Sequence, residues 1–408
     1  MKKLLKINLH WQILIGIILA IIFGLIFPHF VKYIDWLGEL FMRALKMIVV
    51  PLIITSMVSG IVNLSSEHKI GKLGFSALSY IFITTFIAVV LGLLFVNSLK
   101  PGIGCSISTA TDIENIKIQN ITIKDILLGI IPSNIFESMW KGDLLPIIIF
   151  SLLFGFFITK VESSHSLLLK NIFNAGFEVI MNLTQFIIKL SPIGIFALIA
   201  KVVSTQSDIG LMVLNLGKFV LVVLLGFCVQ FFIVLPLIVL FIGKINPVKF
   251  YKKIFIVFLT AFSTASSAAT LSVSMDVAKN NLKISDRIAG FMLPLGATLN
   301  MNGTALYELV VVFFIAQVYG IELSIMQQIV IVLMSLLTAI GSAGIPMASL
   351  VMISVILLSV GLPPEGIALV LAVDRPLDML RTTINVTGDL CGSVVLSSLS
   401  GEHITLDE

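Results

Sequence analysis

One apolar segment near the C-terminal end of the chain carries the residues best suited to chemistry. Between positions 374 and 389 it contains three aspartates and two arginines, although each charge at the centre of a membrane costs on the order of 2.5–3.5 kcal/mol on insertion scales. At about 100° per residue in a helix, six of its polar positions fall on one face within an arc of roughly 100°. They are Asp374, Asp378, Arg381, Thr382, Asn385 and Asp389. This face is predicted to line a polar cavity.

Two kinds of chemistry fit this face. Arg381 could bind a carboxylate through two parallel hydrogen bonds, and Asp378 could pair with an ammonium group. The alternative for these two residues is a salt bridge between them. Asn385 and Asp389 have no second cation on the same face, and such oxygen atoms suit a bound hard cation. The set therefore fits a zwitterion with an extra carboxylate, accompanied by a cation.

A second polar stretch, residues 296–304, interrupts another apolar run. It reads Gly-Ala-Thr-Leu-Asn-Met-Asn-Gly-Thr, which predicts that the helix unwinds there. Unwinding frees backbone carbonyls, and carbonyls with Asn and Asp oxygens form the sodium sites of transporters with broken helices. The alternative is a simple kink whose backbone is solvated by neighbouring hydroxyl groups.

Composition indicates the solvent in which these helices fold. The 408 residues are 58% hydrophobic and only 12% charged, with a mean hydropathy of +1.11, whereas soluble domains carry about 25% charged residues. Too little polar surface remains to cover a water-soluble globule, so we expect a multi-pass membrane protein. At about 20 residues per span, the chain has room for eight to ten spans. The net charge of +4 is interpreted as a topology signal and not as a nucleic-acid footprint.

The distribution of lysines predicts the orientation of the spans. Lysines gather before the first apolar run, after the second and after the sixth, and such clusters mark the cytoplasmic side. The clusters share one side only if the runs at 255–278 and 325–359 each enter and leave the membrane on the same face. Both are interrupted by small residues, at 263–270 and 341–346, as expected of re-entrant hairpins in an inverted-repeat transporter. The alternative is two ordinary helices with small packing residues.

Other functional classes fit the sequence less well. Ser266 and Ser267 could be imagined as the nucleophiles of an intramembrane hydrolase, but no histidine or lysine base lies with them in the run 255–278. The three cysteines show no metal or redox spacing. A face of matched opposite charges suits occluded binding better than a conducting channel. We therefore expect a carrier and not an enzyme.

Five segments resemble those of the dicarboxylate/amino acid:cation symporters, a family that includes the excitatory amino acid transporters and archaeal aspartate transporters. They are residues 192–197, 264–271, 293–307, 341–346 and 377–389, and the resemblance extends over essentially the whole chain. It implies an all-α membrane protein of eight transmembrane helices and two re-entrant helical hairpins with inverted repeats. It also implies a homotrimer that works by elevator-like alternating access.

The resemblance further implies a division of the chain. Residues 1–72 would form scaffold helices 1 and 2, and residues 73–99 would form helix 3 of the moving transport domain. Residues 100–203 would supply an external loop and scaffold helices 4 and 5. Residues 204–408 would complete the transport domain, with hairpin 1 at about 250–279 and hairpin 2 at about 322–359.

Roles carry over by matched position. Arg381 would hold the side-chain carboxylate of the substrate and Asp378 its amino group. The rest of the substrate site would comprise Thr304, Thr382, Asn385, Ser266, Ser267, Gly344 and Ile345. One sodium ion would be held by Gly296, Asn300, Asn385 and Asp389, a second by Thr298 with Ser342 and carbonyls of the second hairpin, and a third by Thr84, Thr85, Asn300 and Asn302.

The chain also departs from the family pattern. Asn302 stands where an aspartate is expected, which removes a carboxylate from the third sodium site. Glu308 stands where many prokaryotic members have Gln, and it is a hypothetical proton carrier. Neither Ala265 nor Met379 is the arginine that usually occupies one of these positions, and Arg375 is a candidate substitute.

The resulting expectation is sodium-coupled uptake of L-aspartate or L-glutamate, with a proton as a further coupled ion. The chain would lie in the plasma (inner) membrane, with both termini in the cytoplasm. Membrane lipid and copies of the chain itself are the expected partners, and neither nucleic acid nor a resident cofactor is expected. The alternative is a proton-coupled or C4-dicarboxylate symporter of the same family. Asp378 and Asp389 argue against the C4-dicarboxylate branch, since succinate would meet a bare carboxylate at Asp378.

Overall fold

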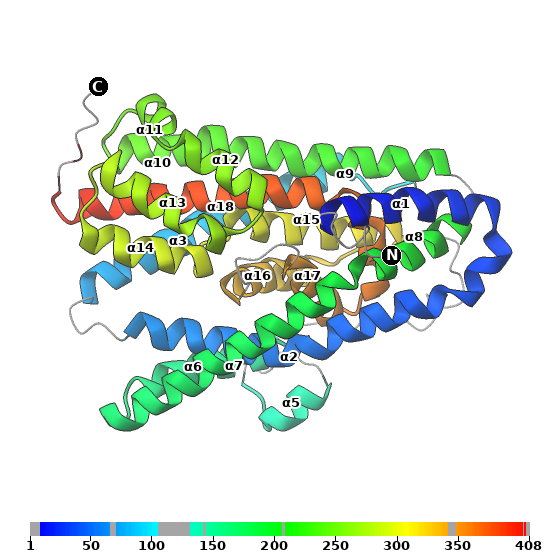
Figure 1. The fold of residues 1–408 in the computed structure, drawn as a ribbon, viewed down its shortest axis with the longest axis horizontal. Coiled ribbons are helices and arrows are strands. Elements are labelled where there is room, and N and C mark those ends of the chain that lie inside the picture. Colours follow the sequence, from blue (N-terminus) through cyan, green and yellow to red (C-terminus); the bar gives the residue numbers. More distant parts are fainter. Residues whose placement is uncertain are drawn as a thin grey trace, which may run out of the picture.

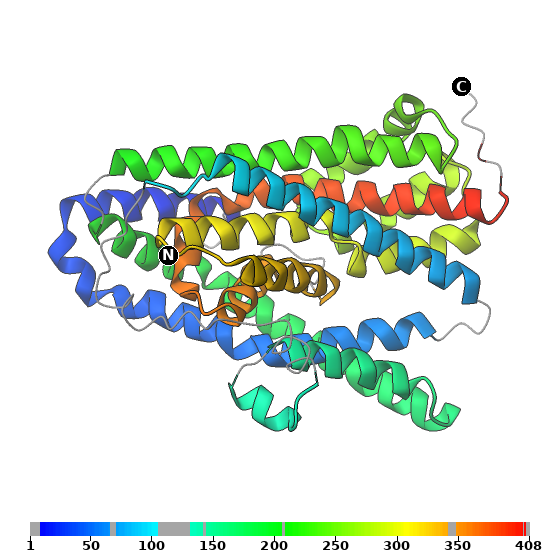
Figure 2. The same ribbon diagram turned by 180° about the vertical axis from the view of Figure 1, so that it is seen from behind.

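A computed structural model describes residues 9–65, 71–104, 131–141, 144–205, 209–341, 348–402 and 404. Every regular element within these ranges is helical, as the apolar runs predict. The all-α class is therefore confirmed, and Figures 1 and 2 show long helices running side by side along the longest axis of the molecule.

The first half of the chain forms helices of which all but α3 pack mainly on one another. They are α1 (Leu9–Ile26), the 3-10 helix η2 (Pro28–Tyr33), α2 (Asp35–Ser65), α3 (Gly71–Leu99), α5 (Ile135–Lys141), α6 (Leu144–Ile158), α7 (Ser163–Lys189) and α8 (Ser191–Thr205). Helix α1 packs on α8, while α2 packs on α6, α7 and α8. Helix α3 lies apart from these, against α9 and α15 of the second half.

The second half surrounds the polar segments. It comprises α9 (Ile209–Val229), the π-helical turn η4 (Gln230–Val234), α10 (Leu235–Phe241), α11 (Pro247–Lys253), α12 (Phe255–Thr264), α13 (Ser267–Asn280), α14 (Asp286–Leu299), α15 (Asn302–Val318), α16 (Ile325–Gly341), α17 (Ala348–Ser359), the 3-10 helix η5 (Pro364–Leu369) and α18 (Leu371–Leu399). Helix α18 contacts α12, α13, α14 and α15, so the charged face has protein on several sides.

A tight turn separates α12 from α13. Ala265 adopts a left-handed conformation with φ 49° and ends α12. Ser266 then caps α13, and its Oγ accepts a hydrogen bond from the Ala269 backbone N–H at 3.2 Å, as serine does at helix starts. The two helices pack on each other. Helices α16 and α17 also pack on each other, and residues 342–347 between them lie outside the described part.

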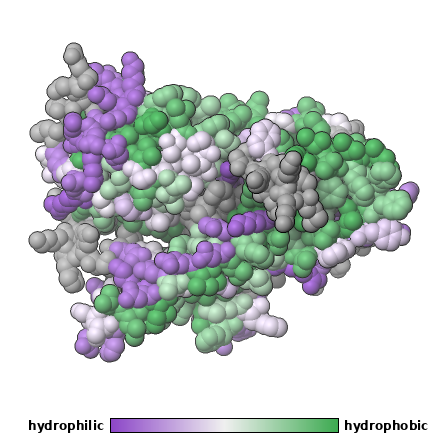
Figure 3. Space-filling model, in the orientation of Figure 1, coloured by the Kyte–Doolittle hydropathy of each residue, from purple (hydrophilic) through white to green (hydrophobic). Residues whose placement is uncertain are grey.

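Four helical stretches in the described residues are long and apolar enough to cross a membrane. They are Asp35–Asn63, Leu73–Leu99, Gly210–Phe241 and Asp286–Val318. The pair α7–α8, bent by 53°, raises the number to five. The expected count of eight therefore stays a prediction. Hydrophobic side chains cover much of the surface in Figure 3, while hydrophilic residues gather at the end that bears α11 and the C-terminus.

Candidate functional site

The site begins where α14 gives way to α15. Asn300 has φ −93° and ψ 74°, which is outside the helical region, and α15 starts again at Asn302. The predicted unwinding within 296–304 is thus confirmed, and it is confined to Asn300 and Met301. Beyond it, every residue of α15 except Gln317 is buried. Polar groups at this break must therefore find partners within the protein.

The polar face of α18 lies against this break. None of its six members is more than 5% exposed, and they are Asp374, Asp378, Arg381, Thr382, Asn385 and Asp389. The packing of α18 against α14 and α15 accounts for this burial. The face is thus enclosed by protein, while the polar cavity expected along it stays a prediction.

A cluster of charges forms the first part of the site. The Nε and Nη2 atoms of Arg381 donate to Asp378 Oδ1 at 2.9 and 2.8 Å, and its Nη1 donates to Asp374 Oδ1 at 3.4 Å. Arg375 Nη1 donates to the second oxygen of Asp378 at 3.1 Å. Tyr307 of α15 contacts two members of this cluster. Its Oη donates to Asp374 Oδ1 at 2.9 Å, and its ring centroid lies 4.7 Å from the Arg381 guanidinium carbon. The internal salt bridge, one of the two alternatives, is present in this structure.

Neutral groups join α15 to α18 beside these charges. Asn385 Oδ1 accepts from the Gly303 N–H at 2.8 Å, and its Nδ2 donates to Thr304 Oγ1 at 3.0 Å. A methyl group at Gly303 would lie 2.8 Å from the Arg381 carbonyl oxygen, so only glycine allows the two backbones this approach. Thr382 Oγ1 donates to the Asp378 carbonyl at 2.8 Å.

A second group of oxygens lies around Asp389. Its Oδ1 accepts from Asn300 Nδ2 at 2.9 Å, and Gly296 lies so close that a methyl group there would overlap the carboxylate. The Oδ1 atom of Asn300 is buried without a hydrogen-bond partner. Asn385 was also predicted to bind this cation, but its amide group is hydrogen-bonded to Gly303 and Thr304 of α15.

A third group involves α3. Thr85 Oγ1 donates to Asn302 Oδ1 at 2.8 Å, while Thr84 Oγ1 is 3.5 Å from the same oxygen. A methyl group at Gly388 would lie 2.9 Å from Asn300 Nδ2 and 3.1 Å from Asn302 Nδ2. The oxygen group around Asp389 and the group around Asn302 therefore lie next to each other, with Gly388 packed against both. No cluster of three His, Cys, Asp or Glu side chains suited to a metal occurs in the described residues. Mixed carboxylate, amide and hydroxyl oxygens suit a hard cation better than a transition metal.

Comparison with known proteins decides the family. Residues 9–399 match the model of the sodium:dicarboxylate symporter family. The chain belongs to this family. It is 37% identical to a proton/sodium-glutamate symport protein of Geobacillus stearothermophilus, over 98% of this chain and 96% of that one. It is 34% identical to a proton/glutamate-aspartate symporter of Escherichia coli strain K12 (97% and 93%) and 33% identical to excitatory amino acid transporter 3 of Mus musculus (97% and 86%). The resemblance to this family is confirmed.

The other predicted site residues of this symporter-family chain lie as follows. Ser266 caps α13, and Ser267 is buried at its first turn. Thr298 is exposed, and its hydroxyl donates to the Leu295 carbonyl of its own helix at 2.9 Å. Ser342, Gly344 and Ile345 lie outside the described residues. Their roles, like those of the other matched positions, stay predictions.

Glu308 lies fully buried on α15. Its Oε2 accepts from Thr338 Oγ1 of α16 at 2.8 Å, and its Oε1 has no hydrogen-bond partner. An ionised carboxylate in such surroundings is costly without a paired cation. The position therefore fits a carboxyl group that gains and loses a proton, and it is compatible with the proton hypothesis.

Sequence reasoning gave no role to three residues that the structure connects to the site. Asp374 had been placed on the polar face by its spacing, but its bond to Tyr307 was not foreseen. Tyr307 follows Gly303 and Thr304 by one turn of α15, so helical spacing could have indicated it. Tyr80 Oη donates to the Gly388 carbonyl at 2.8 Å, and no sequence pattern pointed to this contact.

Proposed function

We propose that this chain is a secondary active symporter that takes up L-aspartate and L-glutamate together with sodium, and with a proton through Glu308. The observation that carries the proposal is the buried cluster of Arg381 with Asp378 and Asp374 at the α15–α18 junction. The printed names of the relatives, which are glutamate and glutamate-aspartate symporters, support the same substrate class.

The cluster can accept an acidic amino acid by exchanging partners. The side-chain carboxylate of the substrate would take the place of the chain's own carboxylates on Arg381, through the same paired geometry. The ammonium group of the substrate would bind Asp378 and so replace Arg381 as the cationic partner of this carboxylate. Thr304, Thr382, Asn385 and Ser267, with the backbone of the two hairpin tips, would hold the remaining polar atoms.

Charge balance explains why cations accompany the substrate. The two arginines, Arg375 and Arg381, balance Asp374 and Asp378. An acidic amino acid adds a net charge of −1, and Asp389 adds another. Burying two uncompensated negative charges is prohibitive, so at least two monovalent cations should enter with each substrate.

The oxygen groups near the break are the candidate places for these cations. Sodium would be held by Gly296, Asn300, Asn385 and Asp389, with further ions at Thr298 and Ser342 and at Thr84, Thr85 and Asn302. The unpartnered Asn300 Oδ1 supports the first assignment, since a bound cation would satisfy it. Sodium is cargo in this proposal, and the chain needs no resident cofactor.

The same proposal includes the architecture of an elevator. Eight spans and two re-entrant hairpins would form a homotrimer in the inner membrane, with both termini in the cytoplasm. Residues 1–72 and 100–203 would be the static scaffold, and residues 73–99 and 204–408 would move. The packing of α1, α2, α6, α7 and α8 on one another, with α3 placed against α9 and α15, supports this division.

Uptake into proteoliposomes tests the function. Labelled L-aspartate would be offered under an inward sodium gradient, or under an inward proton gradient alone, to wild type and Asp378→Asn. We expect sodium-driven uptake that Asp378→Asn abolishes and that Asp276→Asn, an exposed position on α13, leaves intact. Uptake on protons alone, or uptake inhibited by succinate as well as by aspartate, would favour the alternative. Wild-type transport by Asp378→Asn would refute its assigned role.

A further inference from the structure

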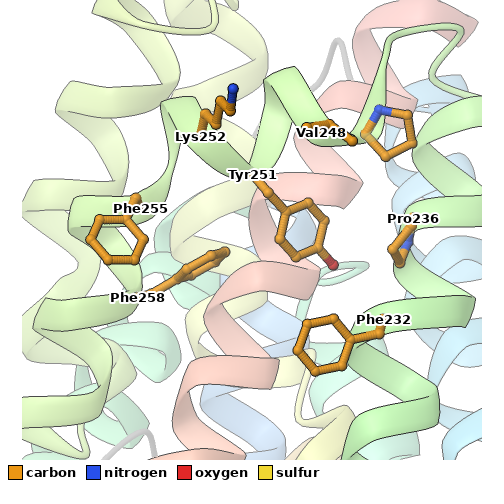
Figure 4. A pocket seen from close by; sticks show the side chains of 8 residues that line it. Phe232, Pro236, Val248, Tyr251, Lys252, Phe255 and Phe258 are labelled. Atoms are coloured by element: carbon orange, nitrogen blue, oxygen red, sulfur yellow. The ribbon is translucent and has the colours of Figure 1, made fainter.

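A hollow of about 630 Å³ opens on the outer surface, away from the substrate site, between η4–α10, α11 and α12. Figure 4 shows Phe255 and Phe258 of α12 on one side and Phe232 and Pro236 on the other. Tyr251 of α11 projects between them, and Lys252 lies at the rim. The hollow is therefore aromatic inside and cationic at one edge.

The walls are fixed by a local backbone irregularity. The π-helical turn Gln230–Val234 interrupts the regular bonding of the α9–α10 stretch, and the Phe231 carbonyl accepts the Tyr251 hydroxyl. The Phe231 ring packs at right angles against Tyr251, with centroids 5.1 Å apart, and 5.2 Å from Phe258. These contacts hold α11 and α12 beside the π-helical turn, so the hollow is preformed.

The surroundings of the hollow are apolar and exposed. Phe232 and Phe255 are 67% and 58% exposed, and Phe241, at the end of the same candidate span, is 72% exposed. Exposed apolar patches of this kind mark surfaces that a membrane or a partner protein covers. Gly210–Phe241 is long and apolar enough to cross a membrane, which favours acyl chains as the neighbours of this face.

Lys252 lines the hollow, and the charges on and around α11 have one sign. Residues 209–275 contain five lysines and no acidic residue, and four of the five lie between positions 244 and 253. Among the described residues, no carboxylate lies within ion-pair distance of Lys249 or Lys252. Lysine clusters directly beside a span attract anionic headgroups, and lysine stems can reach the headgroup level from an apolar surface.

We propose that this hollow binds one anionic phospholipid, with an acyl chain against the aromatic walls and its phosphate group near Lys249 and Lys252. The site is independent of the proposed transport function. It would also join α11 and the first arm of the hairpin at α12 to α10 through a single lipid molecule.

Native mass spectrometry of the purified full chain tests the site. Phosphatidylglycerol and phosphatidylcholine with identical acyl chains would be titrated separately. We expect tighter retention of phosphatidylglycerol by wild type. Each lysine near a membrane surface contributes about a fivefold effect, so Lys249→Ala/Lys252→Ala should weaken phosphatidylglycerol binding by about 25-fold and leave phosphatidylcholine unchanged.

Two further variants make the test specific. Lys160→Ala/Lys170→Ala removes the same charge from α6–α7 and should change nothing. Val248→Trp adds an indole to the lining of the hollow while keeping both lysines, and should weaken both lipids. Equal retention of the two lipids by wild type would overturn the proposal. An equal loss of phosphatidylglycerol binding in Lys249→Ala/Lys252→Ala and in Lys160→Ala/Lys170→Ala would also overturn it. Displacement of phosphatidylglycerol by inorganic phosphate would overturn the role given to the acyl chain.

Discussion

Gly296→Ala tests whether the oxygen group around Asp389 binds sodium. A methyl group built at Gly296 lies 2.6 Å from the Asp389 carboxylate carbon, whereas ordinary van der Waals contact begins at 3.4 Å. The carboxylate must therefore retreat by about 0.8 Å. That movement stretches the 2.9 Å bond from Asn300 Nδ2 beyond hydrogen-bonding length.

The cost follows from the bond that is lost. A hydrogen bond to a charged group contributes about 1.5–3 kcal/mol, which corresponds to about a 10- to 150-fold change in affinity. We expect the half-saturating sodium concentration for aspartate binding to rise within this range, as measured by isothermal titration at a series of sodium concentrations. Binding at saturating sodium should recover, because the substrate cluster around Arg381 is untouched.

Gly290→Ala is the matched control on the same helix. A methyl group at Gly290 meets nothing within 4 Å, and both substitutions share the advantage of about 0.5–1 kcal/mol that alanine has over glycine within a helix. Gly290→Ala should keep its sodium dependence within about twofold of wild type. An unchanged sodium dependence in folded Gly296→Ala would refute the assignment of sodium to Asp389.

Three other substitutions have defined outcomes. Glu308→Gln should abolish the acidification of the vesicle lumen that accompanies aspartate entry, recorded with a trapped pH dye, while sodium-driven uptake continues; persistent acidification would exclude Glu308 as the carrier. Asn302→Asp places a carboxylate beside the Thr85 hydroxyl and should add about one positive charge per transported substrate, measured from the reversal potential; an unchanged potential would contradict a latent third site. Tyr307→Phe removes the donor to Asp374 and should lower the free energy of unfolding by about 1.5–3 kcal/mol, measured by chemical denaturation; a loss below about 0.5 kcal/mol would mean that this bond contributes little.

Helical spacing was enough to predict the polar face of α18 and the break before α15. A period of 3.6 residues placed Asp374 and Asp389 on one side of a helix, and Asn and Gly residues within an apolar run marked the unwound stretch. Both depend on local sequence alone. Tertiary contacts could not be predicted in the same way: the turn of the Asn385 amide toward Gly303 depends on how closely two backbones approach.

The number of spans illustrates a different limit. Composition identifies α2 and α3 readily, because their surfaces are apolar over more than 25 residues. Helix α18 is not among the stretches that pass the same test, since its polar face is hidden inside the protein and not presented to lipid. Helices that line a site are therefore the ones that hydropathy counts least well.

The salt bridge between Arg381 and Asp378 need not be an alternative to substrate binding. An arginine left unpaired at this depth would be destabilising by several kcal/mol, because a buried charge without its partner costs about 3–5 kcal/mol. If Asp378 and Asp374 satisfy Arg381 whenever no substrate is present, the unloaded site never exposes a bare cation to a low-dielectric interior. The substrate then displaces existing partners instead of filling an unsatisfied site, so its net affinity reflects the difference between two well-paired arrangements. Such a difference is small enough for release on the far side and for return of the empty carrier.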